Sequence, residues 1–168
     1  MTELTIANIE KAIIERLKTK IKGLEIIGFP ERPAEYRLIH PKGAILVSYA
    51  GATYSEPQSV NAIVQERKME FDVTVVMRHL RTHEGAYQYL EDVRRALSGY
   101  RISGCSKMYP LRERFLSEEN GIWQYNITFA IIVPAVEKSE EEAEIPLRKI
   151  TTIDDYEITI IRKEGYNG

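Results

Sequence analysis

Residues 65–80, QERKMEFDVTVVMRHL, contain the clearest strand signal in this chain of 168 residues. Apolar side chains occupy every second position here, and charged or polar ones fill most of the gaps. The apolar positions are Met69, Phe71, Val73, Val75 and Met77. Because successive side chains of a β-strand point to opposite faces, the pattern predicts a strand at 68–77 with one buried face. The other face is charged near its start and carries Lys68, Glu70 and Asp72.

The segments on either side supply partners for this strand. Two stretches repeat apolar residues in steps of three and four, which is typical of amphipathic helices, with Thr5 and Thr82 as their expected caps. Shorter apolar or alternating runs predict four more strands, and Asn120-Gly121 is suited to a hairpin turn. In chain order we expect a helix at 6–22, strands at 24–28, 44–49 and 68–77, a helix at 84–97, and strands at 107–116 and 123–133.

This order predicts an α+β fold, α-β-β-β-α-β-β, with two helices packed on one face of a mixed or antiparallel sheet of about five strands. We expect the domain to cover residues 1–136. An acidic linker follows at 137–146, because residues 137–144 hold five glutamates and one lysine. Residues 147–168 form a β-rich C-terminal arm, which we expect to pack on a sheet edge or on another chain.

Composition excludes several classes of protein. The net charge is -2, so no basic surface predicts specific nucleic-acid recognition. No stretch approaches the roughly 18 apolar residues that span a bilayer, so we expect no membrane partner. The single cysteine, Cys105, cannot form an internal disulfide, and this fits a reducing compartment. Apolar residues make up 43% of the chain, which is ordinary for a globular domain.

Motifs that carry chemistry are missing from the sequence. His79 and His83 are four residues apart, but His79 ends a strand and no third ligand is apparent, so a polar turn is favoured over a zinc site. Cys105 has no neighbouring base. We therefore predict no catalytic residue, no cofactor and no metal. The alternative from a different class is a small enzyme whose site is assembled from His40, His83 and Glu84.

Assembly contacts are the remaining candidates. Residues 50–62, AGATYSEPQSVNA, predict a long polar loop, and such loops are often functional. It is a candidate for the contact with the next layer of an assembly, and the charged strand face is a candidate channel wall or subunit contact. Plain solvent exposure is the alternative for both. The candidate assembly contacts are Tyr54, Pro57, Val60, Glu66, Lys68, Glu70, Asp72, Ile158 and Ile160.

Three stretches together resemble a known family. They are QERKMEFDVTVVMRHL at 65–80, the helix GAYQYLEDVRRALSGY at 85–100, and NGIWQYNITFAIIVPAVE at 120–137. Preceded by an amphipathic helix and an apolar strand, this pattern is similar to the Mu-type tail terminators of tailed phages, and through its fold to the lambda-type tail terminators. The resemblance covers roughly residues 5–137 and leaves the acidic linker and the arm outside it.

The resemblance implies a structural virion protein without catalysis or cofactor. Such a protein is expected in the tail or neck of the particle, after assembly in the host cytoplasm. Its expected partners are other copies of itself in a homohexameric ring, the tail tube protein, a sheath where the tail has one, and a neck or connector protein. DNA passes through such a ring without specific recognition. The alternative within the same class is another head–tail joining or tail-completion protein.

Overall fold

The computed structural model describes residues 4–138. The predicted arm at 147–168, with Ile158 and Ile160, lies outside the described residues, as does most of the predicted linker. The elements are α1 (Ile6–Lys20), β1 (Glu25–Gly28), η1 (Pro33–Glu35), β2 (Gly43–Tyr54), β3 (Val64–Met77), α2 (Ala86–Leu97), β4 (Tyr109–Glu119) and β5 (Ile122–Val136).

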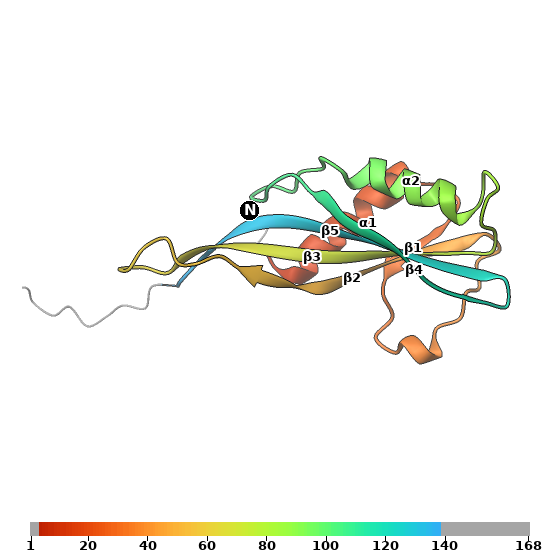
Figure 1. Ribbon diagram of the computed structural model, residues 1–168, viewed down its shortest axis with the longest axis horizontal. Helices are drawn as coiled ribbons and strands as arrows, with labels where there is room; N and C mark the ends of the chain where they lie inside the picture. Colours follow the sequence, from red (N-terminus) through yellow and green to blue (C-terminus); the bar gives the residue numbers. More distant parts are fainter. Residues whose placement is uncertain (1–3, 139–168) are drawn as a thin grey trace, which may run out of the picture. The chain divides into compact units, whose positions relative to one another are not determined.

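The strands form one mixed sheet in the order β1-β2-β3-β5-β4. β1 runs parallel to β2, and every other neighbouring pair is antiparallel. Both helices lie on the same face of this sheet (Figure 1). The predicted α+β fold and its element order are therefore confirmed.

β3 is the centre of the sheet, and it pairs along its whole length with β5, from Val64 opposite Val136 to Met77 opposite Trp123. Its predicted buried face is confirmed, because Met69, Val73, Val75 and Met77 are fully buried and Phe71 is 1% exposed. A strand hydrogen-bonded on both edges cannot slip by one residue without turning this apolar face to water. β3 therefore sets the register of the sheet.

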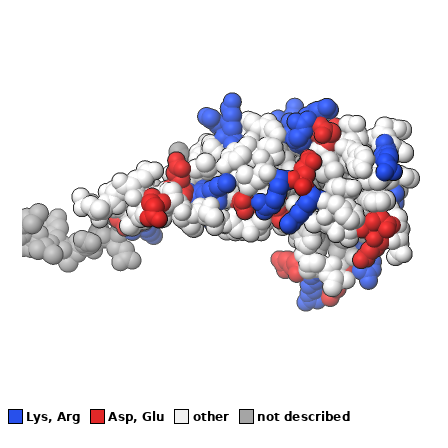
Figure 2. Space-filling view, viewed as in Figure 1, with Lys and Arg blue, Asp and Glu red and all other residues white. Residues whose placement is uncertain are grey.

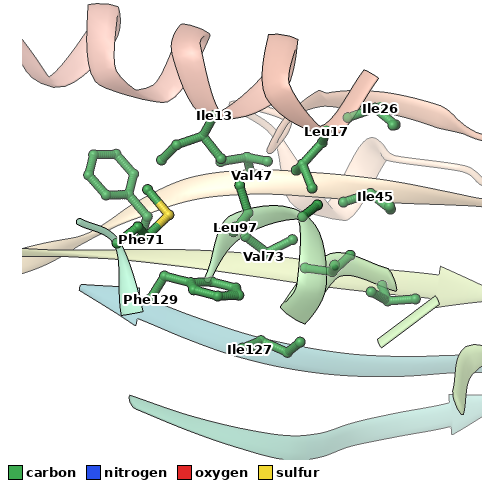
Figure 3. Close-up of a cluster of buried hydrophobic side chains, with 14 of the residues drawn as sticks. Ile13, Leu17, Ile26, Ile45, Val47, Phe71, Val73, Leu97, Ile127 and Phe129 are labelled. Atoms are coloured by element: carbon green, nitrogen blue, oxygen red, sulfur yellow. The ribbon is translucent and has the colours of Figure 1, made fainter. Parts of the chain in front are cut away.

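The core fills the space between the helices and the sheet (Figure 3). Ile13 and Leu17 of α1 point toward Val47 and Ile45 of β2, and Leu97 of α2 lies among the β3 and β5 side chains. The apolar stripe of each helix faces the sheet, as the three- and four-residue spacing predicts. Burial of this face, more than helix propensity, stabilises the two helices.

The helix ends agree with the sequence at one helix and differ at the other. Thr5 caps α1 as predicted, because its Oγ1 accepts a hydrogen bond from Asn8 N at 3.2 Å. The Thr82 cap was wrong: α2 begins at Ala86 and its N-cap is Gly85. A Cβ at Gly85 would lie 2.5 Å from the Leu80 carbonyl oxygen. Only glycine permits this close backbone approach at the N-cap of α2.

The predicted loop at 50–62 is the largest correction. Residues 50–54 belong to β2, so only 55–63 form a loop. A register shift between Tyr49 and Gly51 interrupts the alternation, and Gly51 has a φ of 133°. Such a bulge adds one residue to a strand and hides its period from sequence analysis. The structure also corrects the predicted strand at 107–116, which is β4 at 109–119, and extends the one at 123–133 to 122–136.

The face of the sheet away from the helices is covered at one end. Ala44 and Leu46 of β2 and Val76 of β3 are buried there, beneath side chains that include Tyr36 and Leu38 from residues 29–42. β2 is therefore buried on both faces over residues 43–47. The covering segment does not reach the β2–β3 turn. Residues 29–42 therefore leave the polar side chains near this turn available for contacts with a partner.

Candidate assembly surfaces

The face of the sheet away from the helices carries a chain of polar contacts between β3 and β5. Thr128 Oγ1 donates a hydrogen bond to Asp72 Oδ1 at 2.6 Å, and Asn126 Nδ2 donates one to Thr74 Oγ1 at 3.4 Å. We call these four residues the polar ladder. Thr128 is 0% exposed and Asn126 is 3% exposed. Buried polar groups need such partners, because an unpaired one loses its hydrogen bonds to water.

Of the four predicted charged contacts, two are paired within the sheet and two have no salt bridge among the described residues. Asp72 accepts from Thr128, and Glu70 lies 3.9 Å from the Arg112 guanidinium on β4. Both carboxylates are thus already engaged within the sheet. Glu66 is exposed and Lys68 is half-buried, and neither has a salt bridge within residues 4–138. Glu66 and Lys68 therefore stay available for a partner.

We predict that Thr128→Val lowers the free energy of unfolding by about 1–3 kcal/mol, because it removes the donor to Asp72 at a buried position. Thr53→Val is the matched control, since Thr53 lies opposite Lys68 at an exposed position of the neighbouring strand. Urea melts of the two variants should differ by at least about 1 kcal/mol. Equal midpoints would show that the polar ladder contributes nothing to stability.

The far end of the sheet is a protruding hairpin with apolar side chains in water. We define the hairpin tip as residues 54–64 together with Val136, which pairs with Val64. Of the predicted contacts, Tyr54 is 54% exposed, Val60 is 99% exposed and Pro57 is also exposed. Figure 1 shows this hairpin extending past the two helices. The tip thus has the exposed apolar area typical of interaction sites.

Arg67 stiffens the base of the hairpin tip. Its guanidinium carbon lies 6.0 Å from the centre of the Tyr49 ring and 5.8 Å from that of Tyr54. Its Nη2 also donates a hydrogen bond to the Tyr49 hydroxyl at 3.2 Å. Such cation–π contacts favour one orientation of the tyrosine rings. The tip is therefore presented on a structured base.

A cleft that the sequence did not reveal lies between α2 and β4. It has a volume of about 370 Å³. Phe115 of β4 pairs with Tyr125 of β5, with ring centres 5.4 Å apart, and Tyr87 of α2 lies 6.2 Å from Tyr125. We call it the aromatic cleft. Its lining is Tyr87, Leu90, Glu91, Glu113, Arg114, Phe115 and Tyr125. Only the strand pairing and the helix packing bring these residues together.

The aromatic cleft also perturbs one titrating group. Burial is the main cause that raises the pKa of the Tyr125 phenol, and the neighbouring Tyr87 raises it further. Phe115 is 53% exposed and Tyr87 is 44% exposed, so large aromatic area faces solvent. The chemistry of the cleft is that of a docking site, because tyrosine offers apolar area with a polar tip.

The residues of the alternative enzyme have structural partners. His40 Nδ1 accepts a hydrogen bond from Lys42 N at 3.1 Å, within a turn. Lys42 Nζ lies 2.9 Å from Glu84, and this hydrogen bond lowers the pKa of the Glu84 carboxyl. His83 is exposed. Within residues 4–138, no three His, Cys, Asp or Glu side chains are grouped as a metal site would require.

Cys105 is buried, and burial raises the pKa of its thiol. A raised pKa leaves less thiolate at neutral pH, whereas nucleophilic cysteines have lowered values. The structure thus gives the nucleophile hypothesis no support.

Charge on the visible face is mixed. Figure 2 shows Lys and Arg side chains interleaved with Asp and Glu, without a continuous basic band. In the basic region at 94–114, Arg94 lies 2.6 Å from Glu91, and Arg112 is near Glu70. A nucleic-acid surface is not indicated here. No helix within residues 4–138 has the length and apolar character needed to cross a membrane.

One comparison with known proteins shows the fold, and another shows the family. A chain from the virion of a native gene transfer agent particle superposes with a TM-score of 0.53, at 13% identity, over 79% of this chain and 100% of that one. At this identity the match shows a common fold. No curated protein sequence matches. The model of the Gp37 protein family matches residues 13–157. Because this match spans well over half of the chain, the protein belongs to the Gp37 protein family.

Proposed function

We propose that this protein is a tail terminator, which assembles as a homohexameric ring, caps the head-proximal end of a tail tube and stops its polymerisation. The observation that carries the proposal is the fold, which a chain of a gene transfer agent virion shares over its entire length. The sequence pattern of the two helices and the closing hairpin supports the same role, because it resembles the tail terminators. No catalysis is part of this role.

The proposed partners follow from the same role. They are other copies of the chain, the tail tube protein, a sheath where the tail has one, and a neck or connector protein on the opposite side of the ring. A ring needs a stable body and contacts between complementary patches, together with surfaces left over for the layers above and below. The sheet supplies the body, while the hairpin tip, the aromatic cleft and the free charges Glu66 and Lys68 supply the surfaces.

The test is direct observation of the complex. Purified protein is mixed with tail tubes that have open ends, and the ends are examined by electron microscopy. Six-fold rings on one end, together with arrest of further tube growth, are expected. Rings that attach to heads but leave tube growth unchanged would favour the alternative of a head–tail joining protein. Turnover of a substrate by a strict monomer would contradict both.

The C-terminal arm should matter for assembly rather than for folding. We predict that a chain ending at Glu137 melts at nearly the same urea concentration as the full chain, because the described core lies within residues 4–137. We also predict that it caps tubes less well, because the β-rich residues removed with 138–168 are expected to pack on a sheet edge or another chain. Unfolding of the shortened chain, or capping at full strength, would contradict this prediction.

A further inference from the structure

The hairpin tip and the aromatic cleft are both apolar and exposed, and they lie at opposite ends of one sheet. At the tip, Val64 of β3 pairs with Val136; at the cleft, Val75 of β3 pairs with Tyr125. The eleven residue-to-residue steps from Val64 to Val75 span about 36 Å at roughly 3.3 Å per residue. Because β3 is paired on both edges, this separation is held rigid. One copy therefore presents two distant patches in a constant relation.

We propose that the ring is closed by head-to-tail contacts, in which the hairpin tip of one copy seats in the aromatic cleft of the next. This inference rests on the proposed ring function and names the contact that builds it. Two different patches on one chain make a heterologous interface. When each copy binds the next through this interface, the copies form a closed ring if the rotations between successive copies add up to a full turn.

The shapes of the two patches are complementary. The tip is convex: residues 55–63 form a loop at its end, and Val60 on this loop is the most exposed of the large apolar side chains in residues 4–138, at 99%. The cleft is concave, and its volume of about 370 Å³ has room for several aliphatic or tyrosine side chains. Aromatic residues that line a pocket are the usual anchors of an interface.

The charges around the two patches are complementary as well. Arg114 lines the cleft, and Arg81 lies over the Tyr87 ring at 6.0 Å. Neither arginine has a salt bridge within residues 4–138. The cleft also contains two carboxylates, Glu91 and Glu113. Both interact electrostatically with Arg94 and raise the pKa of its guanidinium.

At the tip, the exposed carboxylate Glu56 likewise has no salt bridge among the described residues, and neither does Glu66 just beyond the tip on β3. Two cations lie beside the tip: Arg67 contacts the Tyr49 and Tyr54 rings, and Lys68 has no salt bridge among the described residues. The tip thus offers the carboxylate Glu56 to a cleft with two arginines that have no salt bridge among the described residues, and this favours tip-to-cleft pairing.

Two variants of the full chain test the contact. Val60→Asp places a charge on the tip, and Phe115→Asp places one in the cleft. Tyr87→Asp is a second cleft variant, used if Phe115→Asp melts early; it lies in the first turn of α2, where a carboxylate is tolerated. Ile39→Asp is the matched control, because Ile39 is 85% exposed and belongs to neither patch. Mass is measured by ultracentrifugation, and rings are counted at tube ends, so a chain that assembles only on the tube is also tested.

We expect each tip or cleft variant alone to remain at the monomer mass of 19.4 kDa. The affinity between copies should fall at least about tenfold, as it does when an interface loses an anchor residue. Ile39→Asp should assemble like the parent chain. The decisive sample is an equal mixture of the tip and cleft variants. The intact tip of one seats in the intact cleft of the other, while the remaining tip and cleft both carry an acid. The mixture should therefore stop at dimers in solution and form no rings on tubes.

Other outcomes overturn the proposal. Normal rings from both variants would show that the contact is elsewhere, while the tail-terminator role stands. A mixture that stays monomeric where the parent chain forms rings in solution would exclude head-to-tail pairing of these patches. Rings of Val60→Asp that form but no longer bind tubes would assign the tip to the next layer. If Val60→Asp weakens assembly of the full chain but not of a chain that lacks residues 138–168, the hairpin tip is assigned to the C-terminal segment instead of the cleft. Absence of rings for the parent chain would refute the proposed function itself.

Discussion

Phe71→Ala should lower the free energy of unfolding by about 3–5 kcal/mol, the largest stability effect expected for a single substitution in this protein. Phe71 lies on the buried face of β3, and its register partners are Tyr49 on β2 and Phe129 on β5. Its ring centre is 5.4 Å from that of Tyr49, and Figure 3 shows its side chain in the core beneath α1. Truncation leaves a cavity at the centre of the sheet, where the paired strands cannot move in to fill it.

The neighbouring residue is the control. Glu70 points to the other face of the same strand and contacts Arg112 at 3.9 Å, with both side chains partly exposed. Glu70→Ala should cost well under about 1 kcal/mol in the isolated subunit, because exposed ion pairs contribute little. The two variants are compared by urea melts under identical conditions. Equal losses would mean that the buried face of β3 has been assigned to the wrong side.

Deletion of this protein should have the largest effect on particle assembly. If the ring caps the tube, then a producing strain without it has no stop signal, and polymerisation continues while subunits remain. We expect overlong tubes without heads, measured by electron microscopy as a broad length distribution in place of a single peak. The physical reason is that each added tube subunit presents the same open end to the next, so length is unlimited without a cap.

Complementation gives the control for this experiment. The parent chain and Ile39→Asp, which changes an exposed side chain outside both patches, should restore the normal length. Phe71→Ala should restore it weakly, because a destabilised subunit has lower abundance in cells. Tails of normal length with attached heads in the deletion strain would remove the tail-terminator proposal, whatever the state of the head-to-tail contact.

Alternation and helical spacing determined most of the fold. The buried face of β3, the stripes of α1 and α2, and the turn at Asn120-Gly121 were all predicted, and Asn120 has the expected positive φ of 53°. These features depend on short-range geometry, since the period of the side chains along one element decides which of them share a face. The Thr5 cap belongs to the same group, because its hydrogen bond reaches only three residues along the chain.

Features that depend on two separate segments were missed. The extension of β2 beyond Tyr49 relies on a register shift that only pairing with β3 defines. The N-cap of α2 is Gly85, which lies close to the Leu80 carbonyl oxygen, and not the predicted Thr82. The local sequence reads as loop at Gly51 and as helix at Gly85, and only the folded structure shows the backbone path that each glycine permits.

The candidate surfaces show the same difference between features that local sequence predicts and features that depend on contacts between separate elements. Exposure of Tyr54 and Val60 could be predicted, because a polar stretch between two strands points into solvent whatever its neighbours do. The aromatic cleft could not, because Tyr87, Phe115 and Tyr125 come from three elements and meet only after β4 pairs with β5 and α2 packs beside them. Periodicity along an element determines which side chains leave the core; the register between elements decides which of them become neighbours, and no local pattern encodes that register.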